Sequence, residues 1–230
     1  MGSCAAPSAK GDDKFITTDY LQQCPYFYRL KKNEYDLSSV TIGLGWDINE
    51  EKKGFLGGIF GKKEEEYDLD VIAFLCNSAG KVTDLGNVEN GKPTLVNGDI
   101  IFFNSLRHKS GNIWLTGDNR TGAGDGDDEQ IIVRLNSLDA QYEKIVFIVQ
   151  IYNGEKLQQH FGKVQNAFIR AVDARNIEMA RFDLSGGPAF ASQRSMVFAE
   201  LIREATGWKL RAIGEPSESD SFVSHLRNYM

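Results

Sequence analysis

Hydrophobic and polar residues alternate along much of the chain in short runs separated by turn-forming residues. In residues 39–47, Val40, Ile42, Leu44 and Trp46 alternate with small residues, and this period of two predicts a strand with one buried face. Other runs rich in β-branched and aromatic residues predict further strands. These lie at 68–76, 98–104, 112–116, 130–135, 166–173, 177–184, 195–203 and 207–213.

Residues 144–152 form a nearly continuous apolar run, which predicts a central strand that is buried on both faces. Residues 155–164 carry the pattern of a short helix, and 136–139 that of a turn. Roughly nine or ten short strands with turn signals about every ten residues are typical of all-β domains. The sequence therefore predicts a mainly β fold, an antiparallel β-sandwich with at most one or two short helices.

The length of 230 residues indicates one large domain or a domain with appendages, and it is enough to bury a core without disulfides. Residues 1–37 are expected to form an N-terminal extension that is partly disordered. The sandwich is expected to cover 38–214, followed by a polar C-terminal tail at 215–230. Inside the sandwich, the loop at 48–66 combines glycine and phenylalanine with a run of lysine and glutamate.

The most unusual stretch reads TGDNRTGAGDGDDEQ at 116–130, where five carboxylates and four glycines accompany one positive charge, Arg120. Like charges about 4 Å apart repel by about 1 kcal/mol per pair even at the dielectric constant of water. Glycine permits tight reversals that bring carboxylates together on one point. A hard divalent cation would relieve the repulsion, and calcium accepts roughly 6–8 oxygen ligands. The alternative is a solvated acidic hairpin loop.

The acidic stretch does not follow the EF-hand pattern. Counting from Asp125, the sixth position is Gln130, where the EF-hand loop requires glycine, and the twelfth is Asn136, where it requires glutamate. Any metal site here belongs to a different scaffold.

The composition narrows the class of protein further. A formal net charge of -6 argues against a general nucleic-acid binder, which needs a basic face. The three cysteines and three histidines have neither disulfide nor zinc spacing. No apolar run reaches the roughly 18–20 residues of a transmembrane helix, and no hydrophobic signal core begins the chain. We expect a cytoplasmic protein that associates with membranes only through partners.

Five motifs in this order resemble the TerD family of tellurium-resistance and stress proteins. They are GLGWD at 43–47, DLD at 68–70, GDNRTGAGDGDDE at 117–129, FGKVQNAFIR at 161–170 and ARFDLS at 180–185. The resemblance implies a β-sandwich whose acidic loops bind Ca²⁺, with two neighbouring ions. It also implies work near the inner face of the membrane, together with other proteins of a stress-resistance complex. No catalytic activity is established for this domain.

Carried onto this sequence, the resemblance supplies a set of candidate ligands. They are Asp47, Asp68, Asp70, Asp118, Asn119, Asp125, Asp127, Asp128, Glu129 and the carbonyls of Gly124 and Gly126. Asp68 and Asp70 share one strand face because side chains repeat every two residues, and they are expected to close the site from the neighbouring strand. Alternatively, Glu129 pairs with Arg120 and does not face the metal.

The chain departs from short family members in residues 1–37 and in the 48–66 insert. Four large apolar residues stand in that insert: Phe55, Leu56, Ile59 and Phe60. They either pack back onto the domain or form a contact patch. Our hypothesis is that the insert is a calcium-sensitive partner contact.

Three kinds of function compete at this point. The first is a calcium-binding interaction module without catalytic activity. The second is a metal-dependent hydrolase, which needs an open coordination position and a general base, although HExxH, Walker and GxSxG motifs are absent from the sequence. The third is a calcium-dependent, lectin-like domain for a small ligand. The sequence favours the first.

Overall fold

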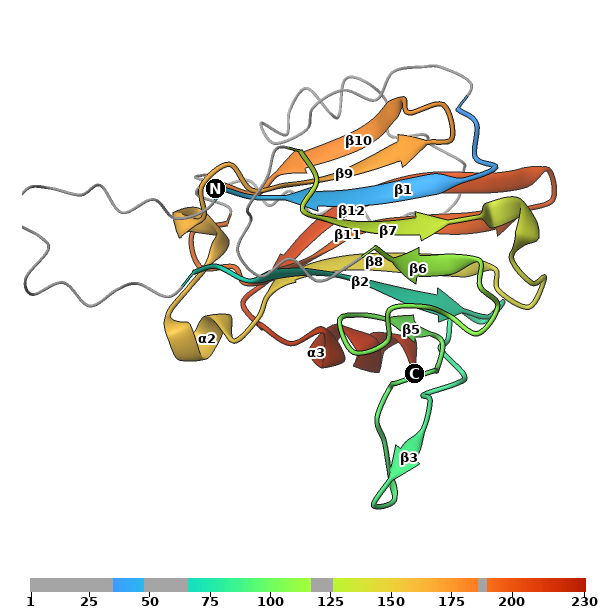
Figure 1. Ribbon diagram of the computed structural model, residues 1–230, viewed down its shortest axis with the longest axis horizontal. Coiled ribbons are helices and arrows are strands. Elements are labelled where there is room, and N and C mark those ends of the chain that lie inside the picture. Colours follow the sequence, from blue (N-terminus) through green and yellow to red (C-terminus); the bar gives the residue numbers. More distant parts are fainter. Residues whose placement is uncertain (1–34, 48–65, 117–125, 186–189) are drawn as a thin grey trace, which may run out of the picture.

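The computed structural model describes residues 35–47, 66–116, 126–185 and 190–230. In these residues two five-stranded antiparallel sheets pack face to face (Figure 1). Sheet A runs in the order β10 (Glu178–Asp183), β9 (Phe168–Asp173), β1 (Val40–Gly45), β7 (Glu129–Val133) and β6 (Ile113–Leu115). Sheet B runs in the order β12 (Gly207–Ser217), β11 (Ser195–Glu204), β8 (Lys144–Ile151), β2 (Leu69–Cys76) and β5 (Ile100–Ile101). The predicted antiparallel sandwich is confirmed.

The main core lies between the two sheets and follows the alternation in the sequence. Val40, Ile42 and Leu44 of β1 are buried in it, so the residues between them face the outer side of sheet A. The predicted central strand is β8, which lies between β11 and β2. Ile145 and Phe147 belong to the main core.

A second core covers the outer face of sheet B. Here Phe74 of β2 packs against Phe222 of helix α3 (Phe222–Leu226), with ring centroids 6.2 Å apart. Residues 215–230, predicted to be a polar tail, are thus part of the domain. β12 extends to Ser217, and α3 continues into the 3-10 helix η5 (Arg227–Tyr229) beneath sheet B (Figure 1). The phenylalanine and leucine of α3 are buried because they pack against the outer face of sheet B.

The remaining elements are short. Where a helix was predicted at 155–164, the chain forms one turn of α2 (Gly154–Leu157) and the 3-10 helix η3 (Phe161–Lys163). The other small elements are η2 (Leu135–Ser137) and a hairpin of β3 (Val88–Glu89) and β4 (Lys92–Pro93) that projects from sheet B (Figure 1). Among the described residues, no helix has the length and apolar character needed to span a bilayer.

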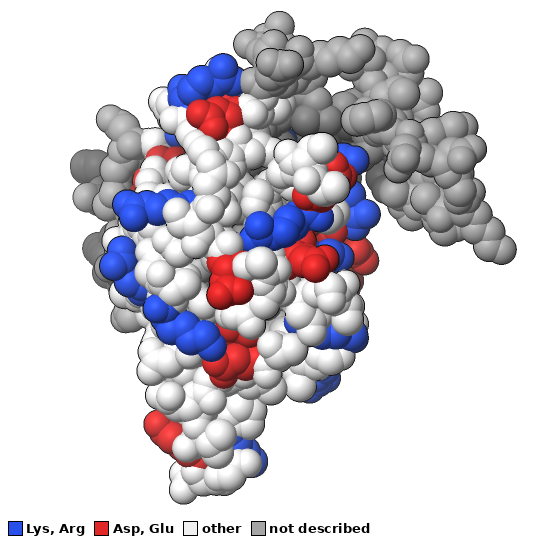
Figure 2. Space-filling model, turned by 90° about the vertical axis from the view of Figure 1, so that its right-hand side faces the viewer, with Lys and Arg blue, Asp and Glu red and all other residues white. Residues whose placement is uncertain are grey.

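The two ends of the sandwich differ. One end carries the last residues of β1 and the first residues of β2, β7 and β9, all on the left in Figure 1. The opposite end faces the viewer in Figure 2, and its visible described residues carry charges of both signs side by side. Exposed ion pairs such as Lys209 with Glu204, 3.6 Å apart, belong to this mixture. The acidic segment enters the fold at the first end.

Candidate metal centre at the acidic segment

Three consecutive acidic residues lead from the acidic segment into β7: Asp127, Asp128 and Glu129. Their backbone is tied to β1, because the Asp128 N–H donates to the Leu44 carbonyl at 2.7 Å and Glu129 is paired with Leu44. The three side chains leave this anchored backbone in different directions, so each has its own surroundings.

Asp127 lies on the outer face of sheet A. Its Oδ1 accepts a hydrogen bond from Arg170 Nε at 2.8 Å, and its Oδ2 accepts one from Arg170 Nη2 at 3.1 Å. Gln130 Nε2 donates a third, also at 3.1 Å. The Asp127 side chain is only 2% exposed. A bidentate arginine fixes both the position and the charge of a carboxylate. The Asp127 carboxylate is therefore held in place by side chains of sheet A.

The glycines of the GLGWD motif make this approach possible. A Cβ atom on Gly43 would stand 2.2 Å from Asp127 Oδ2, and one on Gly45 would stand 2.4 Å from the carbonyl oxygen of Gly126. Only a residue without a side chain lets another segment come so close. Gly126 itself has a φ of 101°, which favours glycine. β1 therefore passes directly beneath the end of the acidic segment.

Asp128 is held beside Asp47. The Trp46 N–H donates to Asp128 Oδ2 at 2.9 Å, and Asp47 is the next residue of the chain. Burial raises the pKa of the Asp128 carboxyl, the Trp46 hydrogen bond lowers it, and the charges of Asp47 and Asp127 raise it further. Asp47 is exposed and accepts a 2.5 Å hydrogen bond from Asn166 Nδ2. Two segments thus bring carboxylates together at this end.

Glu129 points between the sheets. It is 1% exposed, and its Oε2 accepts a hydrogen bond from the Val71 N–H of β2 at 3.0 Å. Because β7 and β2 belong to opposite sheets, this contact joins the two layers. The structure therefore uses Glu129 as a cross-sheet contact.

The structure does not bring Asp70 to Asp127. Asp70 is buried, and its Oδ2 accepts a hydrogen bond from Gln150 Nε2 at 2.9 Å. Gln150 in turn accepts from the Phe222 N–H of α3 at 2.7 Å, so this network lies on the outer face of sheet B. Asp127 lies on the outer face of sheet A, with the main core between them. Asp68 precedes β2 and is half-buried, and its carbonyl accepts from the Tyr152 N–H at 2.8 Å.

The remaining candidates fall partly outside the described residues. Asp118, Asn119, Gly124 and Asp125 do so, as does Arg120, its proposed pairing with Glu129 included. In the part of the chain that the structure describes, no three Asp, Glu, His or Cys side chains are grouped to hold a metal. Asp47 and Asp128 offer oxygen donors of the kind that calcium accepts. They are two of the ligands that a site would need, and the others would have to come from elsewhere.

Arg170 and Asn166 are missing from the predicted site, although they hold Asp127 and Asp47 in place. Both belong to the FGKVQNAFIR motif, one of the five motifs that resemble the TerD family. The arginine and the asparagine in this motif are the sequence feature that could have indicated a role beside the acids. The apolar residues of the insert, with 48–65, also lie outside the described residues, and their role stays a prediction.

The fold and this end of it define a β-sandwich protein in which the end of the acidic segment, from Gly126 to Asp128, packs against the central strand β1 of sheet A. The family model described as the TerD domain matches residues 27–229. The chain belongs to the TerD family. The match extends beyond 38–214 at both ends, in agreement with the packing of α3 on sheet B.

Two relatives carry informative names. The chain is 36% identical over 187 residues to the tellurium resistance protein TerD of Serratia marcescens, covering 81% of this chain and 84% of that protein. It is 34% identical over 202 residues to the stress response protein SCP2 of Bacillus subtilis strain 168, covering 87% and 94%. The chain is therefore related to tellurium-resistance and stress-response proteins over most of its length.

A solved structure shares the fold. A homologue of the telluride resistance protein TerD from Streptomyces coelicolor A3(2) superposes with a TM-score of 0.59 at 21% identity. The match covers 81% of this chain and 94% of that one. The likeness concerns the sandwich architecture alone.

Proposed function

We propose that this chain is a calcium-binding interaction module of the tellurium-resistance and stress-response type, acting in the cytoplasm with other proteins of a resistance complex. The observation that carries the calcium part is the hydrogen bond from the Trp46 N–H to Asp128. It anchors the end of the acidic segment beside Asp47, so that carboxylates from two segments meet. The predicted ligands at Asp118, Asn119 and Asp125 would complete an oxygen shell.

Binding, and not catalysis, is the use that the described contacts support. Asp127 is engaged by Arg170 and Glu129 by the Val71 N–H, so two of the three consecutive acids at 127–129 hold the scaffold together. A cation at Asp47 and Asp128 would fasten the acidic segment to β1 and fix the surface at this end. The names of the relatives, resistance and stress-response proteins, are consistent with a module of this kind.

The first test is a calcium titration by calorimetry, with thermal melts in calcium, magnesium and chelator. A single site at 100-fold excess over its dissociation constant should stabilise the fold by about 2.7 kcal/mol. For a domain of this size that corresponds to a Tm increase of roughly 5–11 °C. Magnesium should have a weaker effect, since it requires strict octahedral geometry.

Asp128→Asn and Asp47→Asn should each weaken calcium binding, whereas Asp139→Asn, an exposed aspartate at the other end of the sandwich, should leave it unchanged. The partner part is tested separately, by co-purification in calcium and in chelator with the Asp128→Asn chain alongside. No heat and no Tm shift would remove calcium from the proposal and leave family membership intact.

A further inference from the structure

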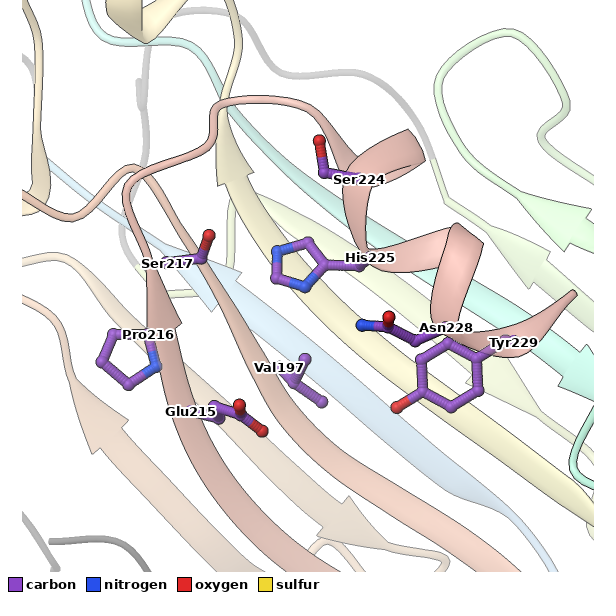
Figure 3. Close-up of a pocket in the computed structure, with 8 residues that line it drawn as sticks. All are labelled: Val197, Glu215, Pro216, Ser217, Ser224, His225, Asn228 and Tyr229. Atoms are coloured by element: carbon purple, nitrogen blue, oxygen red, sulfur yellow. The ribbon is translucent and has the colours of Figure 1, made fainter.

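A pocket of about 250 Å³ lies between the end of β12 and the C-terminal helices. Figure 3 shows the side chains of His225, Asn228 and Tyr229 directed from the helical segment toward Glu215 and Ser217 on β12. Val197 of β11 forms its apolar floor. A cavity of about 10–15 Å³ already holds one water molecule, so the pocket has room for a small organic ligand.

Three side chains around this pocket are available to a ligand. Among the described residues, neither the Glu215 carboxylate, the Asn228 amide nor the Tyr229 hydroxyl has a hydrogen-bond partner. Glu215 also forms no ion pair within that part of the chain. Polar groups that converge on a concave site without satisfying one another are typical of ligand sites.

His225 adds an acceptor. The Ser195 hydroxyl donates to the Ser219 carbonyl at 2.6 Å, so its oxygen must accept the 2.8 Å hydrogen bond from His225 Nε2–H. With the proton on Nε2, a neutral imidazole keeps a lone pair on Nδ1. Burial lowers the pKa of His225, with a smaller opposing effect from Glu215, which favours the neutral ring. His225 is 8% exposed, and in the described structure its Nδ1 has no partner.

We propose that this pocket binds a small protonated amine. Its free groups are mainly acceptors: a carboxylate at Glu215, the Nδ1 lone pair of His225 and the amide oxygen of Asn228. The charge that acts on His225 is the negative charge of Glu215, so an anionic ligand would be repelled. An ammonium group has three N–H donors and the complementary charge.

A transition metal is the competing occupant, because imidazole and carboxylate are both zinc ligands. The pocket supplies only these two strong ligands, and the described residues contain no group of three metal-ligating side chains. A structural zinc site uses four ligands. The amine therefore fits the pocket better, and zinc is one outcome of the test.

The test is an NMR titration of the full chain, labelled with ¹⁵N in histidine, with ethanolamine and 1,4-diaminobutane as probes. Both amines should shift the His225 Nδ1 resonance saturably, whereas ethylene glycol and acetate should not. Glu215→Gln should weaken amine binding about tenfold, as expected when a charged hydrogen bond becomes a neutral one. Glu218→Gln, an exposed neighbour outside the pocket, should leave it unchanged.

Thermal melts of both variants establish that the fold is intact, and the exposure of Glu215 makes that the expected result. Absence of a shift with the amines, or an equal shift with ethylene glycol, would overturn the proposal. So would zinc alone, if it bound at Nδ1 and could not be displaced by the amines. None of these results depends on calcium at the acidic segment.

Discussion

Arg170 of β9 holds the Asp127 carboxylate through two hydrogen bonds, of 2.8 and 3.1 Å, directly above Gly43 of β1. Arg170→Gln should lower the free energy of unfolding by about 1–3 kcal/mol, because Asp127 is almost fully buried and would keep fewer donors. Urea unfolding measures the change. Lys209→Gln is the control and should change stability little, since Lys209 pairs with Glu204 at an exposed position. Equal stability of the wild type and Arg170→Gln would contradict this role.

Gly43→Ala tests the close approach of Asp127 to β1. The added methyl group would stand 2.2 Å from Asp127 Oδ2, so we expect a loss of about 1–3 kcal/mol from overpacking. In an Asp127→Ala background the clash is removed, and the same substitution should cost clearly less. Urea unfolding of all four chains gives the coupling energy. Additive losses would show that the two residues do not interact in this way.

The placement of Asp70 gives a prediction for calcium. Asp70 is hydrogen-bonded to Gln150 on the outer face of sheet B, away from Asp127 and Asp128. Under the proposed function, Asp128→Asn should reduce calcium affinity about tenfold, by removal of one charged ligand. Asp70→Asn should leave the affinity unchanged, although it disturbs the network under α3. Calorimetric titration separates the two, and equal losses would refute the assignment.

Much of the fold follows from local sequence patterns. The alternation of Val40, Ile42 and Leu44 predicts β1, and the apolar run at 144–152 predicts the central position of β8. Both predictions succeed because the hydrophobic pattern along a strand reflects which of its faces are buried. The C-terminal helix was missed. Its apolar residues Phe222 and Leu226 stand at helical spacing, but the segment is short and polar around them, and its stability comes from packing on sheet B.

The candidate site is less accessible to local reasoning. Arg170 and Asp127 are 43 positions apart in the sequence, so a local sequence pattern does not show that they pair. From the sequence alone, a bound metal is the favoured explanation of how the repulsion between the carboxylates is relieved. Asp70 shows the opposite difficulty. Strand periodicity correctly places Asp70 on one face of β2, but its partner Gln150 lies 80 positions away in β8, and the sequence does not show which strand pairs with β2. Local pattern identifies the acids, and only the tertiary structure assigns their partners.

Phe222→Ala tests whether the C-terminal helix belongs to the domain. Phe222 is buried with its ring 5.3 Å from that of Phe102 and 6.2 Å from that of Phe74, measured between centroids. The cavity and the lost burial should cost about 3 kcal/mol. Val223→Ala, the exposed neighbour, should change stability by less than about 0.5 kcal/mol. Urea denaturation measures both, and a negligible effect of Phe222→Ala would show that the helix is dispensable.

A buried hydrogen-bond network around Asp99, which directly precedes β5, predicts that the stability of the fold depends on pH. Burial raises the pKa of the Asp99 carboxyl, but hydrogen bonds from His108, Tyr142 and the Asp84 N–H, with the charge of Lys109, outweigh it, and the pKa is lowered. An unfolded Asp99 then binds protons more readily than the folded one. Asp99 therefore stabilises the fold at pH values above its pKa in the unfolded chain, which is about 4. This contribution to stability is lost as the pH falls through the pKa of Asp99 in the folded protein.

Tyr142→Phe removes the 2.7 Å hydrogen bond from the Tyr142 hydroxyl to Asp99 Oδ1. At pH 7 the variant should be less stable by about 1–3 kcal/mol, as for a hydrogen bond to a charged group. The difference should shrink toward pH 3, because protonation of Asp99 weakens the same bond in the wild type. Urea unfolding between pH 3 and pH 7 measures the difference, with Tyr152→Phe at an exposed tyrosine as the control. A difference that is independent of pH would mean that Tyr142 contributes packing alone and does not stabilise the charged form of Asp99.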